Sequence, residues 1–223
     1  MTELVVFDMA GTTVDEDNVV YKTVRDALNA AGFPVSLERV LAIGAGKAKR
    51  QAIEDLLVQE GSQPDNELID SIYADFKQRL AEAYDKLDVK EQPGTTDVFR
   101  ALHARNIKVA LNTGYDRATA EKLVAKVGWK LGEDFDSLVT ASDVSQGRPA
   151  PDMIFKAMED VGISSSQVVA KVGDSQVDIE EGHNATCGCV LGVTTGAQGE
   201  ELLQQAKPTA VIQQLKDLLD VIL

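Results

Sequence analysis

Cysteine, histidine and long apolar runs are scarce in this sequence of 223 residues, which contains two cysteines and two histidines. No apolar run approaches the roughly 18 residues that a membrane-spanning helix needs. The first three residues, Met1–Glu3, lead directly into an apolar segment and leave no room for a signal peptide. We therefore expect a cytoplasmic protein that has no membrane as a partner.

The two cysteines, Cys187 and Cys189, flank Gly188 in an apolar stretch. This alternation is typical of thiols on a buried strand. A disulfide between residues so close on one strand is geometrically awkward. A metal site is the alternative, but His183 is the only nearby soft ligand that could contribute to it.

Cationic residues are also in deficit, since 22 Lys and Arg stand against 36 Asp and Glu, for a formal net charge of −14. A field of this sign repels nucleic acid and anionic membrane surfaces, so neither is an expected partner. An anionic small molecule can still bind where a local group of cations receives it. Hydrophobic residues make up 44% of the chain, which is enough for one sizeable core and a smaller second domain.

Short apolar runs alternate with helical patterns over most of the chain, which is typical of a Rossmann-like, doubly wound parallel sheet of the α/β class. The predicted strands span residues 4–7, 107–111, 138–140, 168–172, 189–193 and 210–212. The predicted helices that accompany the later strands span residues 94–104, 117–127, 152–161, 179–184, 200–205 and 214–222.

One interval breaks this alternation and shows helical patterns only. The predicted helices within it span residues 20–31, 37–43, 47–59 and 66–87. We therefore predict an all-helical cap domain at residues 15–92, inserted into a core domain made of residues 1–14 and 93–223. The helix at 20–31 also offers a face on which a homodimer could form.

Four polar segments follow predicted strands or lie in the loops between them. They contain Asp8, Thr113 with Gly114, Arg148, and Asp174, with Asp178 one turn further into the helix that follows Asp174. Because the carboxyl ends of parallel strands share one crevice, these side chains are expected to meet. Taken singly, Thr113 or Asp174 could cap the helix that follows it, and Arg148 could be a surface cation.

The residue types in this group suit the transfer of a phosphoryl group. Asp8 and Asp174 offer the oxygen ligands that Mg²⁺ prefers, and Asp8 can attack phosphorus as a carboxylate nucleophile. Thr113, the Gly114 N–H and Arg148 can hold the phosphoryl oxygens of the substrate. Asp178 is expected behind them, where it would orient Arg148.

This set of motifs, with a helical cap inserted after the first one, resembles the haloacid dehalogenase superfamily of aspartyl-phosphate hydrolases. Many of its phosphatases carry Asp-x-Asp, in which the second Asp protonates an alcohol leaving group, whereas this chain has Ala10 at that position. The run from Asp8 to Thr12 is similar to the phosphonatase branch. That resemblance implies that the Ala10 carbonyl is a third Mg²⁺ ligand and that a cap lysine forms an imine with the substrate aldehyde.

The cap segment Gly46-Lys47-Ala48-Lys49-Arg50 supplies candidates for that lysine. It could be a solvated helix face or a basic patch that faces the phosphate. The spacing of Lys49 from Gly46 matches the branch, and nearby like charges would favour a neutral Lys49 amine. Three other positions of the branch differ, because the chain has Asn18, Ala45 and Ala52 in place of its Cys, Met and His.

The main hypothesis from the sequence is a Mg²⁺-dependent hydrolase with catalytic Asp8 and Lys49, acting on a small phosphonate such as phosphonoacetaldehyde. One alternative is a phosphatase of a small phosphate ester that has no imine step. Ala10 argues against it, because an unprotonated alkoxide is a poor leaving group. Another alternative is a non-catalytic binding protein that retains the phosphate site.

Overall fold

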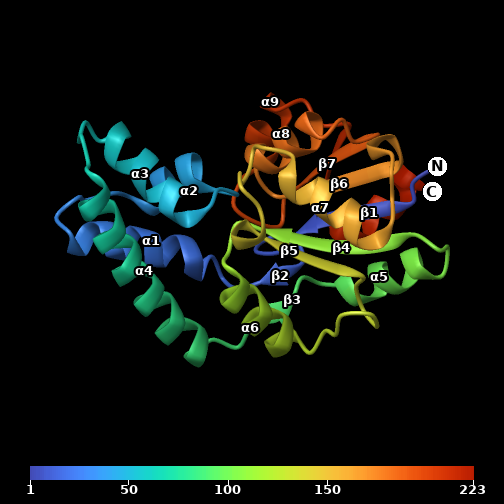
Figure 1. Ribbon diagram of the computed structural model, residues 1–223, viewed down its shortest axis with the longest axis horizontal. Helices are drawn as coiled ribbons and strands as arrows, with labels where there is room; N and C mark the ends of the chain where they lie inside the picture. Colours follow the sequence, from blue (N-terminus) through green and yellow to red (C-terminus); the bar gives the residue numbers. More distant parts are fainter.

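The computed structural model describes residues 1–223 and contains a six-stranded parallel sheet beside a group of helices (Figure 1). The strand order is β5-β4-β1-β6-β7-β8. The strands are β1 (Leu4–Asp8), β4 (Lys108–Thr113), β5 (Ser137–Thr140), β6 (Val169–Gly173), β7 (Cys189–Val193) and β8 (Ala210–Ile212). The predicted α/β class and doubly wound parallel sheet are therefore confirmed.

Helices cover both faces of the sheet because its inner strands are apolar on both sides. Val5 and Phe7 of β1 belong to one apolar cluster, whereas Leu4 and Val6 belong to another on the opposite face. The helices are α5 (Thr95–His103), α6 (Arg117–Val127), α7 (Asp152–Val161), α8 (Gln176–Asn184), α9 (Glu200–Gln205) and α10 (Leu218–Ile222). Helices α5 and α7 lie on opposite faces (Figure 1).

The insertion between β1 and β4 forms four helices that pack on one another at one end of the sheet (Figure 1). They are α1 (Val19–Ala30), α2 (Leu37–Gly44), α3 (Lys49–Gln59) and α4 (Asn66–Lys86). We call these four helices and their connections the helical cap. The proposed domain limits at residues 14/15 and 92/93 remain a prediction.

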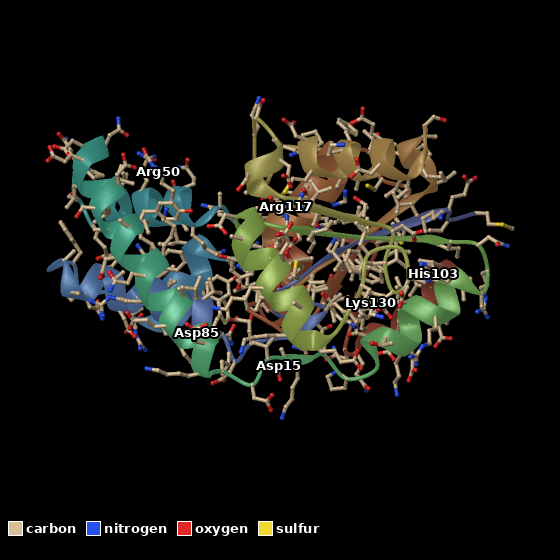
Figure 2. All side chains as sticks on the ribbon, turned by 60° about the horizontal axis from the view of Figure 1, so that its bottom comes forward. Asp15, Arg50, Asp85, His103, Arg117 and Lys130 are labelled. Atoms are coloured by element: carbon tan, nitrogen blue, oxygen red, sulfur yellow. The ribbon has the colours of Figure 1, made fainter.

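Two short strands connect the helical cap to the sheet, and the sequence patterns did not predict them. β2 (Val14–Asp15) pairs with β3 (Lys90–Glu91) in antiparallel register. Strands of two residues are too short to show an alternating pattern, so these positions could not be told apart from helix or loop in the sequence. Asp15 on β2 and Asp85 near the end of α4 are exposed along this connection (Figure 2).

The structure also bears on what the sequence predicted for the two cysteines and for membrane-spanning helices. Cys187 precedes β7 rather than lying within it, and both cysteines are half-buried free thiols. Burial raises the pKa of the Cys187 thiol to about 12. None of the helices combines the length and the apolar character that crossing a membrane requires.

The strand order places a switch point at the carboxyl end of β1. The chain winds from β1 through β4 to β5 on one side, and from β6 through β7 to β8 on the other. Asp8 pairs with Asn112 of β4 in register, and Phe7 pairs with Val172 of β6. Ligands of open α/β sheets bind at such a point, so Asp8 lies where a ligand is expected.

The β1 core gives a direct test of the packing. Phe7 is fully buried, and its ring lies 5.3 Å from that of Phe99 between centroids. Phe7→Ala is expected to lower the free energy of unfolding by about 3–5 kcal/mol, because it removes buried area and leaves a cavity. Phe155→Ala, at a side chain that is 46% exposed, is the matched control and should change it by less than about 0.5 kcal/mol. Urea titration of both variants measures the difference, and equal losses would contradict this assignment of the core.

Candidate active site

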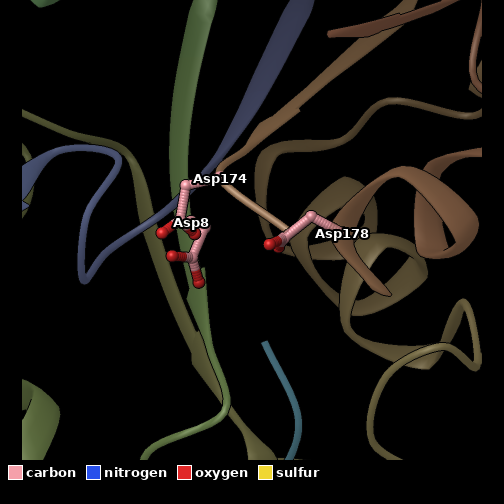
Figure 3. A group of neighbouring side chains, drawn as sticks. All are labelled: Asp8, Asp174 and Asp178. Carbon is pink, nitrogen blue, oxygen red and sulfur yellow. The ribbon is translucent and has the colours of Figure 1, made fainter. Parts of the chain in front are cut away.

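Asp8 lies at the carboxyl end of β1 and is buried among other acidic side chains. Asp174 follows β6 and Asp178 lies in the first turn of α8, so both come from the neighbouring strand and helix (Figure 3). One ligand oxygen from each of the three carboxylates lies within 4.8 Å of the others. The structure thus brings together three of the residues that the sequence predicts at one site.

The turn after β1 depends on Gly11. Its φ is +84°, and a Cβ atom there would lie 2.3 Å from Oδ2 of Asp174. Only glycine fits this conformation and this close approach without strain. The Thr13 hydroxyl donates to the Asp8 carbonyl at 2.9 Å and closes the turn. The neighbouring Ala10 is buried beside this group, with a methyl group where an acid could stand.

Arg148 lies at the centre of the charged group and is fully enclosed. Its Nη1 lies 2.6 Å from Oδ1 of Asp8 and 2.9 Å from Oδ1 of Asp178. Its Nε lies 2.9 Å from Oε2 of Glu181, and its Nη2 donates to the backbone and side-chain oxygens of Asn112. The surface-cation interpretation of Arg148 is therefore wrong, since the guanidinium joins the nucleophile candidate to the sheet beneath it.

Three members of this group were missed in the sequence: Lys171, Glu181 and Asn112. The Lys171 ammonium lies 2.7 Å from Oδ1 of Asn112, 3.1 Å from Asp178 and 3.0 Å from Glu181. All three are fully buried. The available signal was a lysine inside the otherwise apolar strand 169–173, because an unpaired lysine is almost never placed in a core.

Burial and neighbouring charge separate the pKa values of the three aspartates. Burial raises the pKa of Asp8, although Arg148 beside it acts in the opposite direction. Burial and the charges of Asp8 and Asp178 raise the pKa of Asp174 well above its usual range. Burial also opposes the ionisation of Asp178, but Arg148 and Lys171 hold the pKa of that carboxyl below its usual value.

This arrangement fits a divalent cation. Oδ1 of Asp174 is buried and has no hydrogen-bond partner, while its Oδ2 accepts from the Ala197 N–H. The surrounding carboxylates of Asp8, Asp174, Asp178 and Glu181 outnumber the cations Arg148 and Lys171 by two. Carboxylate oxygens are the ligands that Mg²⁺ prefers, and an ion of charge +2 would balance the excess.

The other predicted phosphate-binding residues, Thr113 and Gly114, lie at the end of β4. Thr113 is buried, and its hydroxyl accepts from the Tyr115 N–H at 3.2 Å. The helix that follows is capped by Asp116 rather than Thr113, and α8 is capped by Ser175 rather than Asp174. The capping interpretations of Thr113 and Asp174 are therefore wrong.

A loop of the helical cap, residues 45–48, lies directly against this part of the sheet. Gly46 has a φ of +74°, and a Cβ atom there would lie 2.3 Å from Oγ of Ser175. Its carbonyl accepts from Nη1 of Arg148 at 3.4 Å. On the other side, the Lys47 carbonyl would be 2.8 Å from a Cβ atom at Gly114. The loop brings the beginning of α3 to the edge of the acidic group.

Lys49, the first residue of α3, is buried at this edge. Its Nζ donates to the Lys47 carbonyl at 2.8 Å and lies 4.9 Å above the ring centroid of Tyr21 and 5.9 Å from that of Tyr115. Burial lowers the pKa of the Lys49 amine to about 8, while the charge of Asp8 acts in the opposite direction. The amine therefore loses its proton more readily than an exposed lysine.

The other cations of this segment do not form the predicted patch. Nζ of Lys47 lies 2.5 Å from Asp55, and Nε of Arg50 lies 2.7 Å from Asp70. Each is thus paired with a carboxylate of the helical cap, so the prediction of a shared basic surface is wrong for them. The cause of the low Lys49 pKa is first of all burial rather than repulsion by Lys47 and Arg50.

A cleft of about 210 Å³ opens between α4 and the loop after β4, with Lys49 in its wall. Its aromatic lining comes from Tyr73, Phe76 and Tyr84 of α4 and from Tyr115 of the loop. The Gly114 backbone lines the same cleft. A small organic molecule in it would therefore contact both a lysine amine and the end of β4.

Known proteins resemble this chain over most of its length. The family described as haloacid dehalogenase-like hydrolase matches residues 2–186. A phosphonoacetaldehyde hydrolase of Paraburkholderia xenovorans is 30% identical over 194 residues, which cover 81% of this chain and 70% of that protein.

Solved structures share the fold. A hydrolase from Pseudomonas syringae superposes with a TM-score of 0.87 at 21% identity, over 99% of this chain and 97% of that one. A phosphonoacetaldehyde hydrolase-like protein from Oleispira antarctica superposes with a TM-score of 0.85 at 26% identity, over 99% and 91% of the two chains.

The buried charges make Lys171 a sensitive position. Lys171→Met is expected to lower the free energy of unfolding by about 3–5 kcal/mol, because it leaves Asp178 and Glu181 buried with one cation fewer. Lys156→Met removes a lysine paired with Glu159 and Asp160 on the surface and should have an effect below about 1 kcal/mol. Urea unfolding of both proteins provides the comparison, and a Lys171 variant as stable as the Lys156 control would show that the buried network is not needed.

Proposed function

The chain belongs to the haloacid dehalogenase-like hydrolases, on their phosphonatase-like side, and we propose that it hydrolyses a small phosphonate bearing an aldehyde, such as phosphonoacetaldehyde, with Mg²⁺. The observation that carries the proposal is the buried Lys49 amine at the edge of the Asp8 site. A reactive amine next to a carboxylate nucleophile suits the cleavage of a bond between carbon and phosphorus.

Ala10 supports this substrate class over ordinary phosphate esters. An alcohol leaving group needs a proton as it departs, and the methyl group of Ala10 cannot supply one. A substrate held as an imine on Lys49 has no such need. When the carbon–phosphorus bond breaks, its electron pair moves toward the imine nitrogen and leaves an enamine.

Asp8 is the proposed nucleophile toward phosphorus. The Arg148 guanidinium lies 2.6 Å from Oδ1 of Asp8, so it fixes the orientation of that carboxylate and places a positive charge close to the reacting atoms. Asp178 and Glu181 in turn hold Arg148 from behind. We assign the Thr113 hydroxyl, the Gly114 N–H and Arg148 to the phosphoryl oxygens, where charge spreads during the transfer.

The Asp8 and Asp174 carboxylates and the Ala10 carbonyl are the proposed Mg²⁺ ligands. When bound, the ion would neutralise the carboxylates and the phosphoryl oxygens, so that two anions can approach each other. The unpartnered Oδ1 of Asp174 supports this assignment. Asp178, already held by Arg148 and Lys171, is assigned to positioning these groups.

The proposed metal site predicts a specific loss of binding. Asp174→Asn should weaken Mg²⁺ binding by more than about tenfold, because it removes one negative charge and one strong ligand. Isothermal titration calorimetry with Mg²⁺ measures the affinity directly. The exposed Asp97→Asn provides the control and should bind Mg²⁺ as the wild type does. Equal affinities for all three proteins would exclude Asp174 as a ligand.

The proposed imine predicts a covalent adduct. Borohydride added with phosphonoacetaldehyde should reduce the imine and attach the substrate carbons to Lys49, which mass spectrometry of the peptide would locate. Trapping should accelerate as the pH rises toward about 8, because the neutral amine is the nucleophile.

Matched lysine variants separate the two candidates on this loop. Lys49→Arg should abolish both the adduct and turnover, whereas Lys47→Arg should retain both, because Lys47 pairs with Asp55 instead. Full-rate hydrolysis of phosphonoacetaldehyde by the Lys49 variant would exclude the imine route.

A further inference from the structure

Glu16, Tyr84 and Tyr115 form a hydrogen-bonded chain that the mechanism above does not use. The Tyr84 hydroxyl donates to Oε2 of Glu16 at 3.0 Å, and the hydroxyls of Tyr84 and Tyr115 lie 2.7 Å apart. The three side chains are buried, with exposed fractions of 3%, 1% and 4%. Buried ionisable groups joined in this way can pass a proton along their hydrogen bonds.

The three residues come from three different parts of the molecule. Glu16 follows β2 in the connection to the helical cap, Tyr84 lies near the end of α4, and Tyr115 follows β4 of the sheet. The hydrogen bonds of Tyr84 to Glu16 and to Tyr115 join these three regions at the boundary between the helical cap and the sheet. The chain of hydroxyls therefore crosses that boundary.

The chain ends beside Lys49. Tyr84, Tyr115 and Lys49 line the same cleft, and the Lys49 ammonium lies 5.9 Å from the centroid of the Tyr115 ring. The charge of Glu16 also acts on the Lys49 amine and raises its pKa against the effect of burial. A molecule bonded to Lys49 would thus have the Tyr115 and Tyr84 side chains in the wall around it.

We propose that Glu16 is the proton reservoir for the carbonyl chemistry at Lys49, and that Tyr84 and Tyr115 carry the proton between them. This inference rests on the imine function proposed above. Glu16 acts through the tyrosines and does not touch the substrate, because the hydroxyls of Tyr84 and Tyr115 lie between its carboxyl and the Lys49 end of the chain.

The proton has a defined place in the reaction. The neutral Lys49 amine adds to the aldehyde carbon, and a proton moves from nitrogen to the former carbonyl oxygen to give a carbinolamine. Its carbon–oxygen bond then breaks, the oxygen leaves as water with a proton from the Glu16 carboxyl, and the nitrogen lone pair forms the iminium. After the carbon–phosphorus bond breaks, the enamine takes a proton at its terminal carbon, which the water that hydrolyses the aspartyl phosphate supplies, and becomes the product iminium. When a second water adds to this iminium and releases the aldehyde, a proton returns to Glu16, so that the cycle balances.

The electrostatics of Glu16 suit this task. Burial raises its pKa to about 7, against hydrogen bonds from the Val20 N–H and the Tyr84 hydroxyl. The cations that act on it are Lys49 of α3 and Lys22 of α1. A carboxyl with this pKa is available in both protonation states near neutral pH, which is the condition for efficient general acid–base catalysis.

A purely structural role for Glu16 makes a different prediction. Its Oε2 accepts from the Val20 N–H at 2.9 Å in the first turn of α1, where Asn18 provides no side-chain cap. Gln at position 16 retains an oxygen that can accept this bond but has no proton to release. Glu16→Gln therefore separates helix capping from proton transfer, and Tyr84→Phe breaks the chain while the ring remains.

The test measures two reactions of each variant with Mg²⁺ present. Phosphonoacetaldehyde hydrolysis and borohydride trapping at Lys49 require the relay, whereas hydrolysis of an aryl phosphate requires the Asp8 site but no amine and no proton for its leaving group. Glu16→Gln and Tyr84→Phe should each slow phosphonate turnover and trapping by about 10²-fold or more, and aryl phosphate hydrolysis far less. Glu38→Gln, at an exposed glutamate of the helical cap, is the matched control and should change neither reaction.

The pH profile supplies a readout that a structural role would not move. In the wild type, kcat for the phosphonate should rise as Lys49 loses its proton, with a pKa of about 8, and fall as Glu16 loses its proton, with a pKa of about 7. The rate should therefore peak between these two values, and the descending limb should be absent from Glu16→Gln. If the wild type forms the adduct at Lys49 and both variants react with the phosphonate at the wild-type rate, the relay is wrong and the proposed function stands. If the wild type forms no adduct at Lys49, the proposed function and the relay both fail.

Discussion

The pairing of Arg148 with Asp8 is the interaction on which the rest of the site depends. A guanidinium with almost no exposure is stable only where several acceptors surround it, and Asp178, Glu181 and Asn112 complete that environment. Because these acceptors come from β1, β4 and α8, the ion pairs fix the relative positions of separate elements. The nucleophile candidate is therefore oriented by the same contacts that hold the carboxyl ends of β1 and β4 against α8.

The helical cap completes the site from the other side. Its loop at residues 45–48 approaches both Ser175 and Gly114 so closely that a side chain at Gly46 would collide with Ser175. This approach buries Lys49 and lowers the pKa of its amine. A lysine on an exposed helix would have a far smaller neutral fraction near neutral pH, so the docking of the helical cap increases the fraction of Lys49 that is present as the free amine.

Much of the fold and part of the site could be predicted from the sequence. The apolar runs defined the strands, since a strand covered on both faces must be apolar throughout, and polar residues at their ends marked the site around Asp8. The partners of Arg148 could not be found in this way. The roles of Lys171 and Glu181 depend on the ion pair that joins β6 to α8 in the folded protein. The role of Glu16 depends on its hydrogen bond with Tyr84, which lies 68 residues away in the sequence.

The same limit applies to the cations of the helical cap. Lys47, Lys49 and Arg50 are neighbours in sequence, but a helix start directs them differently, and only Lys49 is buried against the sheet. Their spacing selected Lys49 as the candidate, and the structure shows that it is the buried member of the three. Its lowered pKa follows from that burial, which the local pattern of charges did not predict.

We propose that the Asp8 carboxylate accepts the phosphoryl group during turnover. Rapid acid quench during the reaction of phosphonoacetaldehyde with Mg²⁺, followed by mass spectrometry, would detect that intermediate. We expect a phosphorylated peptide whose modified residue is Asp8, and no such peptide from Asp8→Asn. Wild-type turnover by Asp8→Asn, with no phosphorylated peptide from either protein, would contradict it.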